Sequence, residues 1–472
     1  MVDGGRVVEP SALDGLISAA ATWLTGLGVA QGSVVSWQLP NGLEAYLLYR
    51  ACWRIGAVAA PVHHAAGAAD VAAALDQVEP DLTIAGVDLP AGARRDAVPL
   101  TPGDSTWPPP NVAGAGPWLG PRPSDPAVVL FTSGSSGRPK AVLHTHRGLL
   151  SKARTMAAVH GLTPSDVVLM PAPLAHISGL LNGVLVPGVA GMTSVLMSRW
   201  DPDAAVGLIQ EHGVSFMIGP PTFFVSLMGA AAFSTDRVTS LRLVSSGGSG
   251  VTPAFVESAA ATLQCTVKRT YGSTEAPTVT TSEPSDAPER ARETDGHPTG
   301  EAEIRIADPT DGSERPAGVV GEVWVRGPEL FEGYLDPAMT AEAFAEGGWF
   351  RTGDLGWLDE LGWLTISGRI KDVIIRGGEN ISAAEVEAAL EAHPKVAQAV
   401  AVGYPDDRLG HRVCAFVVAA GTFDIETSRA WMESRGITRF KWPERVVPVE
   451  SLPLMASGKV DRAALERLAA EG

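Results

Sequence analysis

The most informative stretch of this chain is Thr132-Ser133-Gly134-Ser135-Ser136-Gly137-Arg138-Pro139-Lys140. It combines hydroxyl side chains, two glycines and a terminal lysine. Glycines let backbone N–H groups turn toward one concavity, hydroxyls add donors and lysine adds a mobile charge, which suits a polyphosphate. The glycine–lysine spacing differs from that of a Walker A loop, and Pro139 disfavours a helix through the residue before it. Because both flanks, Ala127–Phe131 and Ala141–His144, are apolar, the stretch predicts a phosphate loop between two β-strands.

The length and composition predict a globular protein of two or three domains. The chain has 472 residues, of which 45% are hydrophobic. Its net charge of −17 argues against a nucleic-acid or anionic-membrane surface. Three widely spaced cysteines, Cys52, Cys265 and Cys414, suggest neither a disulfide framework nor a zinc cluster. We therefore expect a reduced, cytoplasmic setting, and the residues Met1–Pro10 do not resemble a signal peptide.

One uncharged segment, Leu180–Met197, has the length of a membrane span. It contains Pro187 and several glycines, which interrupt a helix. We therefore favour a buried core segment or the wall of a ligand tunnel over a membrane helix, and expect no transmembrane segment.

The rhythm of apolar segments predicts an α/β protein with a separate C-terminal part. Helical and strand patterns alternate over 11–85 and again over 147–279, whereas strands and turns dominate beyond Gly296. After Arg369 the pattern becomes α+β, and Ser382 with Glu385 forms a capping-box signature. We predict an N-terminal domain, 1–370, made of two α/β subdomains and a small β-barrel-like subdomain. A small, mobile α+β domain, 371–472, follows it.

Further segments carry groups suited to a nucleotide. Tyr271-Gly272-Ser273-Thr274-Glu275 offers an aromatic ring, hydroxyls and a carboxylate that suits Mg²⁺. Asp354 could accept both ribose hydroxyls, and Ser457-Gly458-Lys459 presents a lysine on a glycine turn. Taken singly, such residues are more often solvated surface or turn residues.

Their order, however, resembles the adenylate-forming superfamily, specifically its acyl-CoA synthetases, from about Leu43 to the last ten residues. The segments that carry this resemblance are the phosphate loop, Pro171–Gly179, Ser246–Gly248, Tyr271–Glu275, Gly321–Pro328 with Gly333-Tyr334, the segments around Asp354 and Arg369, Gly403–Asp407 and Leu452–Lys459. Two departures from the family pattern, Ala175 before His176 and the text Asp295-Gly296-His297-Pro298, concern the pocket shape and leave the catalytic residues intact.

The resemblance implies a first half-reaction that joins a carboxylic acid to ATP. It implies catalytic roles for Lys459, Thr274, Glu275 and His176, with Glu275 as the Mg²⁺ ligand. It also implies nucleotide contacts by Thr132, Ser133, Gly134, Ser135, Ser136, Gly137, Lys140, Gly247, Gly248, Tyr271, Gly272, Ser273, Asp354 and Arg369. Lys459 would lie between the attacking carboxylate and the α-phosphate.

The resemblance also implies a second half-reaction, in which the thiol of coenzyme A displaces AMP after the C-terminal domain rotates. Lys371 would be the hinge, and Gly377 and Gly378 would line the pantetheine tunnel. The acyl pocket would include His176, Ile177, Gly179, Thr270 and Pro277. Because Ala175, Ile177 and Ser178 offer no carboxylate for a substrate ammonium, we expect an apolar acid over an amino acid.

Three alternatives remain open from the sequence. The acyl group could pass to a carrier protein instead of coenzyme A. The chain could be an inactive nucleotide binder, although such a relative would normally have lost Lys459 or Glu275. It could also be a non-enzymatic α/β scaffold with coincidental glycine-rich loops.

Overall fold

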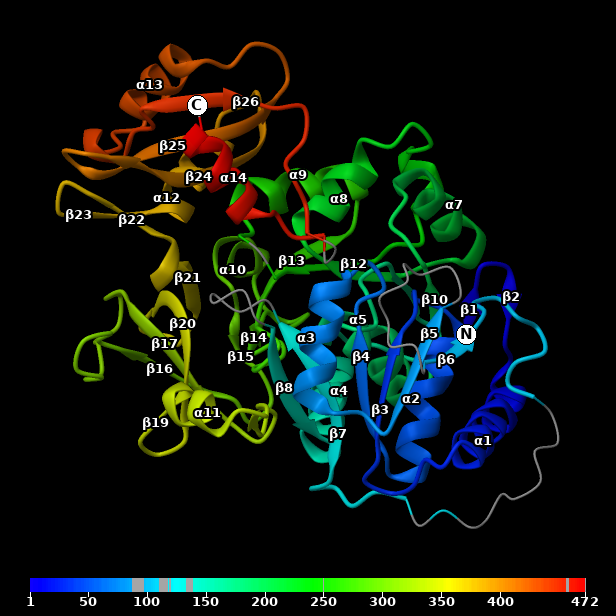
Figure 1. Ribbon diagram of the computed structural model, residues 1–472. Helices are drawn as coiled ribbons and strands as arrows, with labels where there is room; N and C mark the ends of the chain where they lie inside the picture. Colours follow the sequence, from blue (N-terminus) through cyan, green and yellow to red (C-terminus); the bar gives the residue numbers. More distant parts are fainter. Residues whose placement is uncertain are drawn as a thin grey trace.

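A computed structural model describes residues 1–86, 97–109, 118, 120–132, 139–248, 250–455 and 458–471. Within these ranges the strands form four sheets (Figure 1). Helices pack against the two large sheets, and the C-terminal unit lies to the upper left of α8 and α9 in the view of Figure 1.

The two large sheets are mainly parallel. The nine-stranded sheet has the order β15 (His297–Pro298), β14 (Thr280–Thr281), β13 (Thr266–Tyr271), β12 (Leu243–Gly247), β11 (Phe216–Gly219), β9 (Val167–Met170), β10 (Thr193–Leu196), β1 (Val2–Asp3), β2 (Arg6–Val7). The seven-stranded sheet has the order β18 (Gly333–Tyr334), β8 (Lys140–Thr145), β7 (Pro126–Thr132), β4 (Val58–Val62), β3 (Val34–Gln38), β5 (Leu82–Gly86), β6 (Val98–Leu100).

Two smaller sheets complete the chain. The β-subdomain sheet contains β16 (Glu303–Ala307), β17 (Gly321–Arg326), β19 (Phe344–Ala345), β20 (Trp349–Leu358) and β21 (Leu364–Arg369). The C-terminal sheet contains β22 (Val373–Arg376), β23 (Glu379–Ser382), β24 (Val396–Asp406), β25 (Gly410–Ala419) and β26 (Arg445–Pro448).

The helices are short and mostly lie between the strands in the chain. They are α1 (Pro10–Gly26), α2 (Leu43–Ile55), α3 (Ala68–Val78), α4 (His146–Val159), α5 (Ile177–Leu180), α6 (Val186–Ala190), α7 (Pro202–His212), α8 (Pro221–Met228), α9 (Pro253–Leu263), α10 (Pro288–Glu293), α11 (Pro337–Ala343), α12 (Ala383–Glu391), α13 (Ile425–Ser434) and α14 (Arg462–Glu471). Single turns are η1 (Leu181–Leu185), η2 (Thr235–Arg237), η3 (Ile370–Asp372) and η4 (Arg439–Lys441).

The predicted fold class is confirmed: two α/β units are followed by a small β sheet and a small α+β unit. Parallel strands buried on both faces need helical crossovers, and the apolar runs of β9 and β11 supply such strands. One hydrophobic cluster joins both large sheets through the buried helix α2. The two α/β units therefore share a core.

The phosphate loop joins two strands, as predicted. β7 and β8 are antiparallel neighbours, and Thr132 pairs with Lys140 across them. The loop residues Ser133, Gly134, Ser135, Ser136, Gly137 and Arg138 lie outside the described residues.

The uncharged segment Leu180–Met197 is divided among several short elements. The end of α5, the turn η1, helix α6 and strand β10 share it, and most of its residues are buried. Among the described residues no helix is long and apolar enough to cross a membrane. The preference for a buried segment over a membrane helix is confirmed.

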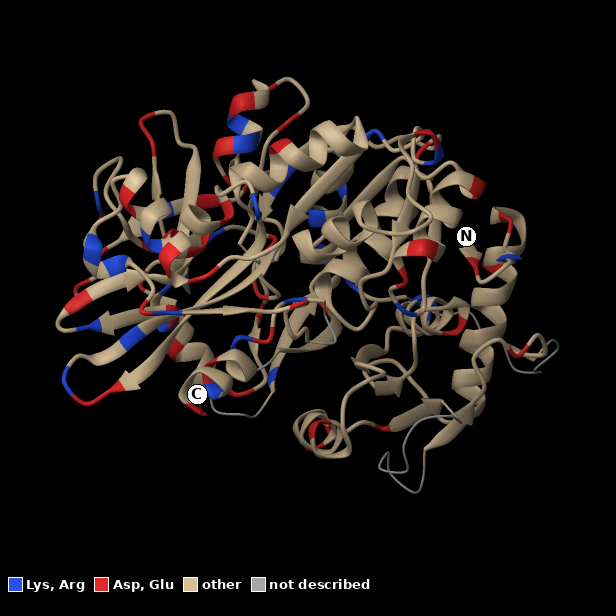
Figure 2. Cartoon of the chain, turned by 90° about the horizontal axis from the view of Figure 1, so that it is seen from above, with Lys and Arg blue, Asp and Glu red and all other residues tan. Residues whose placement is uncertain are grey.

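The C-terminal unit combines small apolar cores with many surface charges. Ser382 caps α12 by accepting a hydrogen bond from the backbone N–H of Glu385 at 3.3 Å, as its capping-box signature predicts. Figure 2 shows positive and negative residues interspersed on the side of the molecule that carries the C-terminus. Several form ion pairs, among them Arg376 with Glu444 and Arg412 with Asp406.

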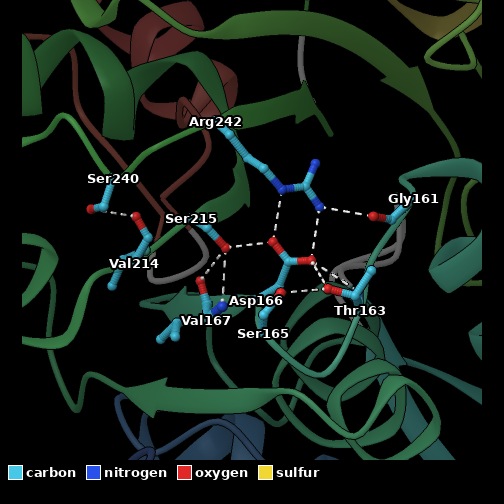
Figure 3. A network of polar contacts seen from close by, with 9 residues as sticks. All are labelled: Gly161, Thr163, Ser165, Asp166, Val167, Val214, Ser215, Ser240 and Arg242. Carbon is cyan, nitrogen blue, oxygen red and sulfur yellow. Dashed lines mark hydrogen bonds and ion pairs between the residues drawn. The ribbon is translucent and has the colours of Figure 1, made fainter.

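A polar network around Asp166 connects the starts of β9, β11 and β12, three adjacent inner strands of the nine-stranded sheet (Figure 3). Arg242 donates from Nε and Nη2 to the two carboxylate oxygens of Asp166, at 2.7 and 2.9 Å. Ser215 donates to Oδ1 at 2.7 Å. Burial would raise the pKa of Asp166, but these bonds outweigh it and hold the pKa below its usual value of 3.8.

We expect Asp166→Asn to lower the free energy of unfolding by about 1–3 kcal/mol, because Arg242 then loses its ionised partner. A carboxylate with a depressed pKa stabilises the fold above its unfolded-state pKa, and this contribution fades as the pH falls below it. Urea unfolding should therefore show a constant gap between the two proteins at neutral pH that narrows below about pH 4. A gap that does not depend on pH would contradict this account.

Candidate active site

The ends of several strands converge on one region of the N-terminal part. Gly247 ends β12 and pairs with Thr270 of β13, and Tyr271 is the last residue of β13. Ligands of parallel sheets bind beyond the carboxyl ends of the strands, where loops from neighbouring strands meet. Lys140, at the start of β8, reaches this region, since its Nζ lies 5.0 Å from the centre of the Tyr334 ring.

Asp354 and Arg369 come from adjacent positions on β20 and β21. Arg369 donates from Nε to Oδ1 of Asp354 at 2.6 Å, and the Tyr271 hydroxyl donates to Oδ2 at 2.8 Å. Asp354 is only 3% exposed. Burial and the neighbouring Asp354 carboxylate raise the pKa of Tyr271 well above its usual value, so this phenol remains a donor. The arrangement orders an aromatic ring, a carboxylate and a guanidinium beside one another.

The loop after Tyr271 folds back tightly on itself. A Cβ atom on Gly272 would lie 2.3 Å from the backbone nitrogen of Thr278, so no other residue fits there. Within this loop Glu275 accepts a hydrogen bond from the Tyr334 hydroxyl at 2.8 Å, and Ser273 accepts one from the backbone N–H of Ala276 at 3.1 Å.

His144 supports the same loop from β8. Its Nε2 lies 2.8 Å from the carbonyl oxygen of Thr274 and donates to it. Burial lowers the pKa of His144 to about 4, so the ring is neutral at physiological pH. The loop is therefore anchored by neutral donors.

Lys459 reaches the site from the C-terminal unit. A Cβ atom on Gly248 would lie 3.2 Å from Cε of Lys459, so the lysine stem lies against the end of β12. Thr222 of α8 donates to the carbonyl oxygen of Gly458 at 2.7 Å, which docks the lysine turn on the N-terminal part. The C-terminal segment can be followed to α8 in Figure 1.

The charges around Lys459 come from the residues just described. Burial lowers the pKa of the Lys459 ammonium, and the positive charge of Arg369 lowers it further. Glu275 and Asp354 act in the opposite direction. Lys459 thus belongs to one electrostatic cluster with Arg369, Glu275 and Asp354.

His176 lies at the start of α5, beside two further histidines. Its ring centre is 5.3 Å from that of His63, which stacks on His64 at 4.6 Å. Burial, and then the neighbouring His63, Lys459 and His64, lower the pKa of His176 to about 3. His176 is therefore neutral, and it lies within electrostatic reach of Lys459.

The remaining predicted pocket residues are only partly brought together. Ile177 and Gly179 follow His176 on α5, and Thr270 bonds the carbonyl oxygen of Thr280 at 3.2 Å. Pro277 lines a small cavity with Lys152 and Leu330.

The predicted hinge and tunnel residues lie apart from this cluster. Lys371 is in the turn η3, between β21 and β22. Gly377 and Gly378, with φ of +60° and +90°, form the two-residue turn of the β22–β23 hairpin. Figure 1 places this hairpin well away from α8, so Lys459 and the glycine turn do not occupy the site together.

Two side chains of the site were given no role by sequence reasoning. Tyr334 belongs to the quoted pair Gly333-Tyr334, but only β18 pairing with β8 brings it to Glu275. His144 ends the apolar run 141–143 of β8 and is followed by the polar Thr145, so no local pattern distinguished it.

Residues 6–335 match the family AMP-binding enzyme, and residues 385–459 match the AMP-binding enzyme C-terminal domain. The chain belongs to the AMP-binding enzyme family. The medium-chain fatty-acid–CoA ligase of Escherichia coli K12 is 34% identical over 97% of this chain and 85% of the relative. The salicyl-AMP ligase / salicyl-S-ArCP synthetase of Mycobacterium tuberculosis H37Rv is 33% identical over 96% of this chain and 84% of the relative.

A solved structure shows the same fold along the whole chain. ATP-bound MatB from Rhodopseudomonas palustris has a TM-score of 0.89 at 27% identity, covering 98% of this chain and 94% of that chain. Apo MatB, with the same coverage, has a TM-score of 0.80. Together with the family and the CoA-ligase relatives, this makes the protein an adenylate-forming enzyme, an AMP-forming acid–CoA ligase.

Proposed function

We propose that this ligase activates a carboxylic acid with an apolar body and transfers the acyl group to coenzyme A. In the first step a carboxylate oxygen bonds to the α-phosphorus of ATP, and the bond from that phosphorus to pyrophosphate breaks. In the second step the thiol sulfur bonds to the acyl carbon, and the bond from that carbon to the AMP oxygen breaks. The thiol proton passes to water.

The nucleotide roles that we propose follow from which residues lie together at the ends of the strands. Tyr271 would stack on the adenine opposite the backbone of Gly247 and Gly248. Asp354 would accept the ribose hydroxyls while Arg369 holds its carboxylate in place, and the 2.6 Å bond between them supports this role. The loop from Thr132 to Lys140 and the residues Gly272, Ser273 and Thr274 would contact the phosphates.

One observation carries the proposal: the docked Lys459 lies against Gly248, within the charge cluster of Glu275, Asp354 and Arg369. A cation there can neutralise charge on the attacking carboxylate and on the α-phosphate oxygens. It also holds the two reactants at attack distance. The depressed pKa of Lys459 is expected to rise when these anions bind, because opposite charges favour the ammonium.

The residues present fit a magnesium ion held together with the substrate. Mg²⁺ is usually bound by one or two carboxylates plus substrate phosphates and water. Glu275 offers such a carboxylate: Tyr334 occupies Oε1, and no hydrogen bond from the described residues reaches Oε2. The ion would neutralise phosphate charge when bound, and the Tyr334 hydroxyl would orient Glu275.

We propose an acyl pocket around His176, Ile177, Gly179, Thr270 and Pro277. The neutral His176 and the buried side chains of β11 and α8, such as Ile218 and Phe223, support an uncharged acyl body. The medium-chain fatty-acid relative supports an aliphatic acid, whereas the salicyl relative supports an aryl acid. Whether the acyl body is an aliphatic chain or a ring must therefore be determined by experiment.

For the second step we propose that residues 371–472 rotate about Lys371. The rotation would withdraw Lys459 and bring Gly377 and Gly378 to the pantetheine tunnel. Two observations support the proposal that this structure has the adenylate-forming arrangement. The Thr222 hydroxyl bonds to Gly458, and the structure is more similar to ATP-bound MatB than to apo MatB by TM-score. The free cysteines support the proposed cytoplasmic location.

A carrier protein is the second candidate acceptor, because the salicyl relative is named for loading a carrier.

The experiment that tests the proposal is a panel of straight-chain, alicyclic and aryl acids, given with ATP and Mg²⁺. Acid-dependent ATP–pyrophosphate exchange measures the first step, and AMP release with coenzyme A or with a phosphopantetheinylated carrier measures the second.

We expect exchange with one class of these acids and AMP release that depends on coenzyme A. Release that requires the carrier would favour the second candidate. A purified, folded protein that exchanges pyrophosphate with no acid in the panel would contradict the proposed substrate class.

A further inference from the structure

A buried lysine of α4, outside the residues proposed to bind substrate, reaches the loop that carries Tyr271 and Glu275. Lys152 is 1% exposed, and its Nζ donates to the carbonyl oxygen of Thr278 at 3.0 Å and to the Thr299 hydroxyl at 3.3 Å. It also forms an ion pair with Glu329, and the two side chains are 2% and 5% exposed. A buried ion pair is often no more stabilising than apolar residues of similar size. Stability alone therefore does not explain why Lys152 and Glu329 are buried together.

Thr278, which receives the lysine, has a strained backbone. Its φ of +39° is rare for a β-branched residue. Such strain persists only where surrounding contacts impose it, and it concentrates at functional sites. The carbonyl oxygen of Thr278 accepts from Lys152 and also from the Thr299 hydroxyl, at 2.9 Å. These two donors hold the carbonyl side of the strained peptide.

A shift at Thr278 would pass directly to the nucleotide-facing end of the loop. Gly272 packs directly against the backbone nitrogen of Thr278, so the two ends of the loop cannot move closer together. The next residue, Val279, donates from its backbone N–H to the carbonyl oxygen of Tyr271 at 2.7 Å. Tyr271 and Thr278 are therefore parts of one rigid turn.

Glu329, which pairs with Lys152, lies close in the chain to a second contact with the same loop. Oε1 of Glu329 accepts from the Thr155 hydroxyl of α4 at 2.7 Å. Two residues further along the chain, Phe331 donates from its backbone N–H to the carbonyl oxygen of Glu275 at 2.8 Å. The Lys152–Glu329 pair thus clamps both the end of the loop and the segment that holds Glu275.

We propose that Lys152 is a positioning residue for the MgATP site, acting through Thr278 to hold Tyr271 and Glu275 in register. This inference rests on the proposed function, because it assigns those two residues to the nucleotide and its metal ion. Lys152 touches no substrate in this account. Its removal should weaken MgATP binding and leave the apparent affinity for the acid nearly unchanged.

The test separates positioning from simple stabilisation. In Lys152→Met, Glu329 is left buried without its partner, so both stability and MgATP binding should fall. In the double variant Lys152→Met/Glu329→Met, no buried charge remains and much of the stability should return, but Thr278 still lacks its lysine donor. We expect the KM for MgATP in pyrophosphate exchange, and its Kd by calorimetry, to stay raised about tenfold in both variants.

Asp166→Asn is the control, because it breaks the Asp166–Arg242 ion pair, whose further hydrogen bonds go to Gly161, Thr163 and Ser215 and not to the loop. It should lower the unfolding midpoint and leave the KM for MgATP unchanged. A double variant with the wild-type KM and Kd for MgATP would overturn the inference, even if Lys152→Met alone fails to fold. A wild-type protein without exchange would instead overturn the proposed function, so the two failures are distinguishable.

Discussion

Lys459→Ala should lose acid-dependent ATP–pyrophosphate exchange by about 10²-fold or more, yet still convert a supplied acyl-adenylate and coenzyme A to thioester. The ammonium lies beside Gly248 in the docked arrangement, where it can stabilise charge developing on the reacting oxygens. Once the acyl-adenylate has formed, pyrophosphate has left with its charge, so the thioester step does not need the lysine.

The measurement compares the two half-reactions in the same preparation. Lys395→Ala is a suitable control, since Lys395 is an exposed lysine of the same C-terminal unit that lies outside the site. It should retain both activities. Equal loss of both half-reactions in folded Lys459→Ala protein would show that the lysine also serves the thioester step, and the two-arrangement account would be wrong.

Lys371→Pro should have the opposite pattern: near-normal adenylate formation and slow thioester formation. Proline fixes φ near −65° and removes a backbone donor, whereas a hinge residue must change its dihedral angles. Lys371 also lines a cavity of about 530 Å³ between η3 and α14, so the surroundings of the turn are not tightly packed. A conformational penalty of about 3 kcal/mol corresponds to roughly 10²-fold in the rate of a step that needs rotation.

Single-turnover experiments can measure this effect by following adenylate formation and its consumption by coenzyme A separately. Lys371→Ala removes the same side chain but leaves the backbone free, so it should retain most of the thioester rate. If Lys371→Pro and Lys371→Ala slow both steps to the same extent, the hinge lies elsewhere.

Much of the local structure could be predicted from sequence patterns. The apolar runs on both sides of TSGSSGRPK predict β7 and β8, and Ser382 with Glu385 predicts the start of α12. These features depend on neighbours within a few residues, where periodicity and capping act directly. The resemblance to acyl-CoA synthetases then brought distant motifs together, and the family matches confirm it.

The support around the site could not be predicted in this way. Tyr334 is brought to Glu275 only because β18 pairs with β8, and His144 reaches Thr274 from a strand whose pattern indicates only core. No local pattern states which carbonyl a buried donor will meet. The domain boundary near Lys371 and the individual site roles stay predictions that the variants above test.

Sequence patterns alone were enough to predict the α/β rhythm and the two strands that flank residues 133–139, since these follow from residue type and short spacing. The roles of the phosphate loop and of Lys459 come from the resemblance and stay predictions. The tertiary structure alone decided which distant groups meet. Lys152 and Thr278 are 126 residues apart, and Thr222 and Gly458 are 236 residues apart. Contacts at such separations are set by strand order and by the packing of whole units, which no short segment of the chain encodes.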